Sequence, residues 1–376
     1  MSKIRNQKRI GIITLSASDN CGSLLQAFAL QQILKERFAY RVEIINLKTK
    51  KSARVYDLFT KDFYRHPRKT LFVLMHIRSI WNQKRDYEDF RKQYLDMTHR
   101  VYKNISDLKH LKYDYDVIIA GSDQLWNADM LDYDDAFFIP WETSAKKVAY
   151  SVSLGSLQKY DSVKTEHVRK WLKNFDMISV REVTGKQTLE VLTNKRIEIL
   201  ADPTLLIEPE EWKLLAGGRM ISKEYIFYYS WAYSDVSMNK IVQRFAKEKS
   251  LDVYVINSSK WRRFRPEKFG FWLYEKSGPI AFINLMLYAK YVFVQSFHGV
   301  VFSNILKKRF FFLNENIDVD FRADNMLKIF HEENQIIHSW EDMERAMNTN
   351  LTYTSEEYML LVNKSLEYLS AIEKLF

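Results

Sequence analysis

Residues 9–37 read RIGIITLSASDNCGSLLQAFALQQILKER, and this stretch sets the architecture that we expect for the whole chain. Residues 9–15 are apolar and β-branched, which predicts a buried strand. Residues 16–23 are small or polar and predict a loop, while residues 24–37 carry apolar side chains at helical spacing. A second β-branched run follows at residues 41–47. A strand–loop–helix–strand unit of this kind is typical of a parallel α/β sheet.

The same alternation continues to residue 313. Further strands are expected at residues 115–120, 147–153, 177–181, 196–200, 225–229, 252–257, 291–295 and 309–313. Further helices are expected at residues 162–174, 237–249, 279–288 and 299–306. Pro203 and Pro209 lie in a stretch without periodicity, which indicates a connection between two domains. The predicted fold class is α/β, with two Rossmann-like domains.

The expected domain boundaries follow from these elements. The first domain spans residues 1–205 and carries a basic helical insertion at residues 48–92. The second Rossmann-like domain spans residues 206–335. Residues 336–376 form a helical extension that packs on the first domain, and its last helix begins at Ser355 with two acidic residues in its first turn.

Composition excludes several classes of protein. Hydrophobic residues make up 47% of the 376 residues and charged residues 28%, as in an ordinary globular chain. Cys21 is the only cysteine, which excludes an internal disulfide and an all-cysteine zinc site. The histidines lack metal-ligand spacing, so no metal site is expected. Without a signal peptide or an apolar run of about 18 residues, a reduced, cytoplasmic location is expected.

The net charge of +10 indicates an anionic partner, but the charge is unevenly distributed. Residues 48–92 hold thirteen Lys and Arg against five Asp and Glu, a net charge of +8. Residues 331–376 hold nine acidic residues against three Lys and Arg, a net charge of −6. The basic segment therefore has two interpretations. It docks on an anionic membrane surface, or it is a solvated face that pairs with the acidic C-terminal helix.

Four loops are candidates for chemistry, because ligands of parallel sheets gather at the carboxyl ends of the strands. They are residues 16–23, residues 121–127 (GSDQLWN), residues 179–182 (SVRE) and residues 295–299 (QSFHG). The first precedes a helix N-terminus, which attracts anions, or it is a plain loop with Ser23 as the N-cap. The second is a polar–aromatic cluster, or a turn capped by Asp123. Neither G-x-G-x-x-G nor a P-loop is present, so a dinucleotide site is unsupported.

Two of these loops carry residues suited to catalysis. Arg181 leaves a buried strand and can hold a phosphate or carboxylate in a bidentate fork. Alternatively, it forms a salt bridge with Glu182 or another carboxylate. His298 is suited to acid–base work near neutral pH, and Gly299 lets the backbone approach a ligand closely. Alternatively, His298 is structural.

In this order, the loops resemble the polysaccharide pyruvyl transferase family. The family's N-x-G-x-x-L-Q-A-x-A-L occurs here at residues 20–30 and its G-S-D-Q-x-W-N at residues 121–127. Its S-x-R-E occurs at residues 179–182, its D-P-T at residues 202–204 and its S-F-H-G at residues 296–299. Many relatives carry S-R-L-H-G instead, and the position of their Arg is Ser296 in this chain. The match runs from about residue 10 to about residue 315.

The resemblance implies a fold similar to the GT-B glycosyltransferases, with the C-terminal helix crossing back to the first domain. It also implies transfer of pyruvate from phosphoenolpyruvate to two hydroxyls of a sugar, which gives a cyclic ketal. The partners expected are phosphoenolpyruvate as donor substrate and a sugar or lipid-linked oligosaccharide as acceptor. Contact with the inner face of an anionic membrane belongs to the docking interpretation. No cofactor, metal or nucleic acid is expected.

The reaction assigns roles to the loop residues. His298 is expected to be the general acid/base, and Arg181 to clamp the anionic groups of the donor. Asp123 and residues 16–23 are expected to orient the acceptor, with Trp126 giving the sugar an aromatic face. The expected substrate-binding residues are Asn20, Gly22, Ser23, Gln26, Gly121, Ser122, Asp123, Gln124, Trp126, Asn127, Glu182, Ser296, Phe297, Gly299 and Arg322.

Two other functions remain open from the sequence. A glycosyltransferase that uses a sugar nucleotide would have the same architecture. A non-catalytic or nucleic-acid-binding protein would use the basic segment and show salt-sensitive binding.

Overall fold

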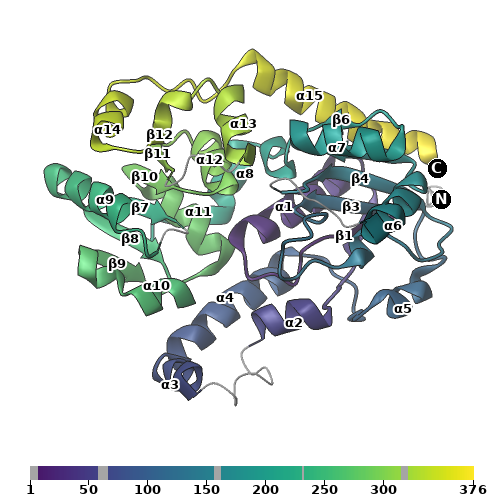
Figure 1. The fold of residues 1–376 in the computed structure, drawn as a ribbon, viewed down its shortest axis with the longest axis horizontal. Helices are drawn as coiled ribbons and strands as arrows, with labels where there is room; N and C mark the ends of the chain where they lie inside the picture. The colour runs from purple at the N-terminus through teal and green to yellow at the C-terminus, as the bar shows by residue number, and fades with distance from the viewer. Residues whose placement is uncertain (1–6, 58–66, 156–161, 231–232, 315–320) are drawn as a thin grey trace, which may run out of the picture. The chain divides into compact units, whose positions relative to one another are not determined.

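The computed structural model describes residues 7–57, 67–155, 162–230, 233–314 and 321–376. These residues form two compact units (Figure 1). Unit 1 comprises Met1–Pro67, Arg91–Ile207 and Leu360–Phe376. Unit 2 comprises Arg68–Phe90 and Glu208–Met359.

The described part of unit 1 is built on a six-stranded parallel sheet with the order β2-β1-β3-β4-β5-β6. Its strands are β1 (Arg9–Ile13), β2 (Arg41–Ile44), β3 (Val117–Asp123), β4 (Lys146–Val152), β5 (Met177–Val180) and β6 (Glu198–Ile199). Its helices are α1 (Cys21–Gln32), α2 (Lys50–Tyr56), α5 (Ile105–Leu108), α6 (Ser162–Lys173) and α7 (Val183–Thr193). Because β1 pairs with both β2 and β3 in parallel, the carboxyl ends of these strands meet at one edge.

The described part of unit 2 repeats this plan with the strand order β12-β11-β10-β7-β8-β9, again all parallel. Its strands are β7 (Tyr225–Tyr229), β8 (Asp252–Ile256), β9 (Phe271–Tyr274), β10 (Tyr291–Val294), β11 (Phe310–Leu313) and β12 (Ile336–Ile337). Its helices are α3 (Pro67–Met75), α8 (Pro209–Ala216), α9 (Val236–Lys249), α10 (Ser259–Phe264), α11 (Gly278–Tyr288), α12 (Phe297–Ile305), α13 (Phe321–Ile329) and α14 (Trp340–Met347).

Two helices, α4 (Ile77–Tyr94) and α15 (Glu356–Ala371), contribute several residues to each unit, and α3 contributes only Pro67 to unit 1. The end of α15 belongs to unit 1, where the Ser365 hydroxyl accepts a hydrogen bond from the Ala201 amide at 2.8 Å. The Tyr368 hydroxyl donates to the Ala149 carbonyl at 3.0 Å. The C-terminal helix therefore returns to the first unit.

The division of the chain differs from the expected ranges in two places. Residues 68–90 of the basic segment belong to unit 2 rather than to the first domain, because Ile80, Tyr87 and Phe90 are buried on the inward face of α4. Residues 336–359 also belong to unit 2, because β12 pairs with β11. Residues 58–66 of the basic segment lie outside the described residues.

Aromatic side chains supply much of the core of unit 2, which accounts for the high aromatic content of the chain. The ring centroid of Phe245 on α9 lies 5.0 Å from that of Tyr291, 5.3 Å from that of Phe293 and 5.5 Å from that of Phe311. These edge-on contacts pack one helix against the neighbouring strands β10 and β11. Among the described residues, no helix combines the length and the apolar character needed to cross a bilayer.

Glu332 gives unit 2 a dependence on pH that the sequence does not reveal. Burial raises the pKa of this carboxyl to about 7, although the nearby polar groups of Asn304 and the Tyr353 backbone and the charge of Arg309 act in the opposite direction. The pKa of Glu332 is higher in the folded than in the unfolded protein. Its contribution to the free energy of unfolding is therefore fully present below the unfolded pKa. It is lost as pH rises through the folded pKa.

We therefore expect the free energy of unfolding to fall by up to about 3 kcal/mol between acidic and mildly alkaline pH on account of this group. Glu332→Gln should remove that share of the pH dependence in urea unfolding followed by circular dichroism. The exposed neighbour Glu333 provides the control, because Glu333→Gln should leave the dependence as it is. The same slope in Glu332→Gln and wild type would contradict the assignment.

Candidate functional site

The loop after β1 leads into α1, and its polar side chains turn toward the end of β3. Asn20 is the N-cap of α1, since its Oδ1 accepts a hydrogen bond from the Ser23 amide at 3.2 Å. Ser23 is therefore not the N-cap. Its hydroxyl instead donates to Oδ2 of Asp123 at 2.6 Å, across 100 residues of sequence. Gly22 lies buried in the first turn.

Gln26 ties α1 to the strands beneath it. Its fully buried side-chain amide donates to the Thr14 hydroxyl and to the Ser23 carbonyl, both at 2.8 Å. Its Oε1 accepts from the Ser122 amide at 2.9 Å. Gln26 thus fixes the height of the helix above the ends of β1 and β3.

The end of β3 brings the second motif to the same place. Gly121 must lack a side chain, because a Cβ there would lie 2.3 Å from the Tyr150 carbonyl oxygen of β4. The Ser122 hydroxyl donates to the Ser151 carbonyl at 2.7 Å. Asp123 has a φ of +81°, an uncommon conformation for a residue other than glycine. The close strands and this backbone turn direct the Asp123 carboxylate toward Ser23 and Arg181.

Arg181 joins three strand ends through its buried guanidinium. One amino group donates to Oδ1 of Asp123 at 3.2 Å, and the other to Oδ2 of Asp202 at 3.0 Å. Oδ1 of Asp202 accepts from the Thr204 amide at 3.1 Å and from its hydroxyl at 2.7 Å. We call Ser23, Gln26, Ser122, Asp123, Arg181 and Asp202 the Arg181 cluster.

Glu182 adds a third carboxylate beside the guanidinium. Its Oε2 lies 3.9 Å from Nε of Arg181, and its Oε1 accepts from the Leu154 amide at 2.8 Å. Arg181 is thus surrounded by carboxylates, and a bound anion would have to compete with them. Of the two interpretations of Arg181, the structure shows the salt bridge, with Asp123 and Asp202 as partners.

The rest of the GSDQLWN motif is structural in part. Trp126 is fully buried, stacks on Phe138 with 4.8 Å between ring centroids, and donates its indole N–H to the Phe137 carbonyl at 3.1 Å. The expectation that Trp126 offers an aromatic face to a sugar is wrong, because both faces of the ring belong to the core. Gln124 accepts a hydrogen bond from the Asn127 side chain at 2.7 Å.

The fourth motif lies in unit 2, where β10 ends and α12 begins. The helix starts at Phe297, two residues earlier than expected, because the Ser296 hydroxyl caps the Gly299 amide at 3.0 Å. A Cβ on Gly299 would lie 2.7 Å from Cβ of Val294, so the helix can start this close to the strand only with glycine. His298 is partly exposed in the first turn, and Phe297 is buried.

Two further polar residues of unit 2, Ser230 and Arg322, lie on segments that contact this motif or its helix. The Ser230 hydroxyl, which follows β7, donates to Oε1 of Gln295, which follows β10. Arg322 is the second residue of α13, a helix that packs on α12. Sequence patterns did not single out Ser230, since a lone serine after a strand carries no distinctive signal.

Arg91 is a second residue that sequence reasoning missed. From the end of α4 its guanidinium donates to the Ser16 carbonyl at 2.8 Å, to the Ser18 carbonyl at 2.7 Å and to Oδ1 of Asp19 at 2.7 Å. Arg91 therefore shapes the loop after β1. In the sequence it is one of thirteen Lys and Arg in the basic segment, so nothing distinguishes it.

The same loop contacts a tyrosine–carboxylate pair, in which Asp132 is buried and Tyr56 partly buried. The Ser18 hydroxyl donates to the Tyr56 hydroxyl at 2.9 Å, which donates to Oδ2 of Asp132 at 2.9 Å. Burial raises the pKa of Asp132. Burial, together with the charge of Asp132, also raises the pKa of Tyr56.

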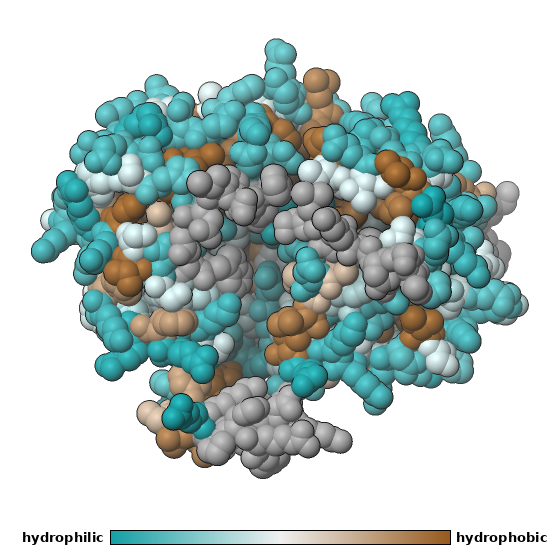
Figure 2. All heavy atoms as spheres, in the orientation of Figure 1, coloured by the Kyte–Doolittle hydropathy of each residue, from teal (hydrophilic) through white to brown (hydrophobic). Residues whose placement is uncertain are grey.

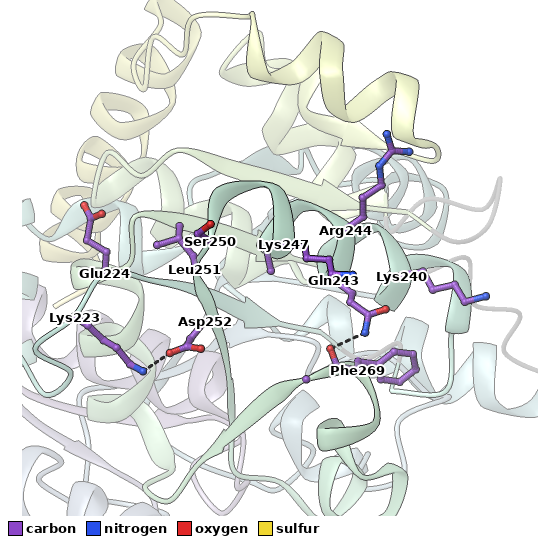
Figure 3. Close-up of a pocket in the computed structure, with 12 residues that line it drawn as sticks. Lys223, Glu224, Lys240, Gln243, Arg244, Lys247, Ser250, Leu251, Asp252 and Phe269 are labelled. Atoms are coloured by element: carbon purple, nitrogen blue, oxygen red, sulfur yellow. Dashed lines mark hydrogen bonds and ion pairs between the residues drawn. The ribbon is translucent and has the colours of Figure 1, made fainter.

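A large surface hollow of about 990 Å³ lies elsewhere in unit 2 (Figure 3). Lys223 and Asp252, an ion pair at the amino ends of β7 and β8, line it together with Gln243 and Lys247 of α9. Gln243 donates to the Phe269 carbonyl at 3.1 Å. None of the four motifs contributes to its lining, because they all follow carboxyl ends of strands.

The family model for polysaccharide pyruvyl transferases matches residues 20–316 of this chain. This span includes the motifs at residues 20–30, 121–127, 179–182, 202–204 and 296–299. The chain belongs to the polysaccharide pyruvyl transferase family. It is thus a member of a family of transferases. No curated protein matches it.

Solved structures with the same fold are distant in sequence. The S. aureus MnaA–UDP complex is 11% identical with a TM-score of 0.57, covering 98% of both chains. The Methanocaldococcus jannaschii UDP-GlcNAc 2-epimerase complex with UDP-GlcNAc and UDP is 10% identical with a TM-score of 0.54, covering 96% of this chain and 99% of that one. The Rickettsia bellii UDP-N-acetylglucosamine 2-epimerase is 8% identical with a TM-score of 0.51, covering 98% and 95%. These similarities show the GT-B fold.

The buried ion pairs of the Arg181 cluster should contribute to the stability of the fold. Arg181→Ala leaves three buried carboxylates without their cation, so we expect a loss of about 3–5 kcal/mol in the free energy of unfolding. Arg196→Ala is the control, since it removes an exposed ion pair with Glu198 and should cost less than about 1 kcal/mol. Urea unfolding measures the loss of stability in each variant. Equal losses would show that the buried ion pairs stabilise the protein no more than the Arg196–Glu198 pair does.

Proposed function

We propose that the protein transfers pyruvate from phosphoenolpyruvate to a sugar of a polysaccharide or of its lipid-linked precursor, forming a pyruvate ketal. The observation that carries the proposal is the assembly of the family's motifs. Segments from residues 20–30, 121–127, 179–182 and 202–204 form one hydrogen-bonded cluster. A cluster of charged side chains at the carboxyl edge of a parallel sheet is where such folds bind ligands.

The reaction needs three events. A proton must reach the methylene carbon of phosphoenolpyruvate, which leaves an oxocarbenium-like centre at the adjacent carbon. One sugar hydroxyl then forms a C–O bond to that carbon and loses its proton. A second hydroxyl forms the second C–O bond as the bond to the phosphate oxygen breaks. Of the two hydroxyl protons, one balances the proton used at the methylene and the other leaves with inorganic phosphate.

His298 is the proposed general acid/base. Its imidazole lies in the first turn of α12 and is partly exposed, so it can meet a substrate at the end of β10. Imidazole exchanges protons near neutral pH. Ser296, Phe297 and Gly299 hold it there by capping, burial and close helix–strand packing.

The Arg181 cluster is proposed to organise the acceptor side. Arg181 holds Asp123 through an ion pair, and Asp123 in turn accepts the Ser23 hydroxyl. This geometry makes Arg181 a positioning residue, while Ser23, Asp123 and the loop shaped by Arg91 present oxygens to sugar hydroxyls. Asn20, Gly22, Gln26, Gly121, Ser122 and Glu182 support that arrangement through helix capping, close packing and buried hydrogen bonds, and Gln124 and Asn127 extend its polar surface.

The donor's anionic groups then need another cation. Relatives with S-R-L-H-G have an Arg where this chain has Ser296, so that position supplies none here. Arg322, at the start of α13, is the proposed substitute because α13 packs on the helix that carries His298. Arg322→Ala should raise the KM for phosphoenolpyruvate.

The reaction itself is tested by incubating the purified protein with phosphoenolpyruvate and candidate acceptor glycans. Mass spectrometry should show an acceptor heavier by pyruvic acid minus one water, with release of one inorganic phosphate per transfer. Stabilisation against heat by sugar nucleotides but not by phosphoenolpyruvate, with no such product, would favour a sugar-nucleotide glycosyltransferase instead.

His298→Gln tests the proton-transfer role. We expect kcat to fall by about 10²–10⁴-fold because general acid–base catalysis typically contributes that much. The midpoint of urea unfolding should stay near that of wild type, since the side chain is partly exposed. His331→Gln, which alters an exposed His–Glu357 pair, is the control and should retain activity. Unchanged transfer in His298→Gln would remove His298 from the mechanism.

A further inference from the structure

The helices α3 and α4 present large apolar side chains to solvent. Leu71 is 61% exposed, Leu74 58%, Met75 71% and Trp81 60%. Among the described residues, other strongly exposed apolar side chains are scattered along the chain, whereas these four fall within residues 71–81. Figure 2 shows apolar side chains at the surface where Figure 1 places α3. A concentration of this kind marks an interaction surface.

The opposite side of the same helices is anchored in unit 2. Val73, Ile80 and Tyr87 are buried. Gln83 accepts a hydrogen bond from the Arg262 guanidinium at 2.9 Å, and Asp86 accepts one from the Ser277 amide at 2.8 Å. The apolar side chains are therefore exposed on helices whose opposite side is already packed and hydrogen-bonded within unit 2.

The charge around the apolar side chains has one sign. Residues 67–85 contain five Lys and Arg and no Asp or Glu. Arg68, Arg78 and Arg85 are exposed. On α4, Arg78, Trp81 and Arg85 are three and four residues apart, which puts them on one face of the helix. On α3, Arg68, Leu71 and Met75 follow the same spacing. Leu71 and Trp81 thus each have an arginine three or four residues away on the same helix.

We propose that this face, Leu71, Leu74, Met75 and Trp81 with Arg68, Arg78 and Arg85, docks on an anionic lipid surface. Lipid headgroups complement the arginines, and the acyl boundary takes the apolar side chains, as with interfacial helices generally. A second copy of the chain is a poorer occupant, because pairing this face with itself would bring positive charge against positive charge. Tryptophan suits the boundary, since its ring is amphipathic.

Among the described residues, the ion pairs of the C-terminal helix α15 are made with residues outside this face. Glu357 of α15 pairs with His331 at 3.1 Å, and Lys364 of α15 pairs with Glu198 at 2.5 Å. The docking proposal does not depend on the proposed reaction. It is measured by binding alone, so its failure would leave the pyruvyl transfer untouched, and the reverse also holds.

The test is cosedimentation of the full-length protein with vesicles that contain phosphatidylglycerol, compared with pure phosphatidylcholine vesicles. We expect binding to the anionic vesicles that weakens with salt. Arg78→Gln with Arg85→Gln should lower the partition coefficient about 30-fold, at about fivefold for each charge. Leu74→Ser with Met75→Ser should lower it at least about tenfold, because buried apolar area is lost.

Two control variants separate this face from general properties of the surface. Leu214→Ser removes an apolar side chain that is 81% exposed on α8. Lys240→Gln with Lys247→Gln removes two charges from α9, beside the hollow in Figure 3. Both controls should sediment like wild type.

Four results would overturn the proposal. They are no sedimentation at low salt, equal loss in the lysine control, retention of binding in Leu74→Ser with Met75→Ser, or a dimer in ultracentrifugation that this apolar variant abolishes. Circular dichroism of each variant shows that the loss is not due to unfolding.

Discussion

The guanidinium of Arg181 is the constraint on which the carboxyl edge of the sheet in unit 1 depends. It is buried at the end of β5, and a buried charge is tolerated only when partners surround it. Asp123 at the end of β3 and Asp202 after β6 are those partners, at 3.2 and 3.0 Å. Because each partner makes further hydrogen bonds, the ion pair fixes the loops as well as the two side chains. The Ser23 hydroxyl then brings α1 into the same network.

This arrangement explains why segments far apart in the sequence recur as one family signature. The D-P-T motif contributes a buried Asp202, whose second oxygen accepts a hydrogen bond from the Thr204 hydroxyl. Its role is to complete the charge balance around Arg181. In the proposed reaction the acceptor would meet a preorganised edge, which lowers the cost of ordering the site when substrate binds. The proposed proton transfer is assigned to His298. The start of its helix is fixed by the Ser296 cap and by the close packing of Gly299.

The sequence was sufficient for the parts of the fold governed by local pattern. The β-branched runs that became β1, β3, β7 and β10 are buried on both faces, so their composition alone indicates strands. Short pieces such as β9 and β12 have no such run and were missed. The basic segment was assigned as a whole to the first domain, whereas the inward face of α4 places residues 68–90 in unit 2. That choice depends on tertiary contacts, which helical periodicity does not encode.

The candidate site shows the same division. Residue types located the Arg181 cluster, but they could not decide between Arg181 as an anion clamp and Arg181 as an ion-paired residue, since that depends on which carboxylates the topology brings near. Trp126 was expected at a sugar and lies in the core, because the spacing of one aromatic residue does not show which way it faces. The N-cap of α1 is Asn20 and not Ser23. Both residue types suit an N-cap, and the choice depends on backbone angles that the sequence does not show.

A double-mutant cycle on Arg181 and Asp123 tests the central claim most directly. The free energies of unfolding of Arg181→Gln, Asp123→Asn and the double variant would be compared with that of wild type. If the buried ion pair organises the site, the two changes should be coupled by more than about 1 kcal/mol, with the double variant less destabilised than the sum of the single ones. Additivity within about 0.5 kcal/mol would contradict the account.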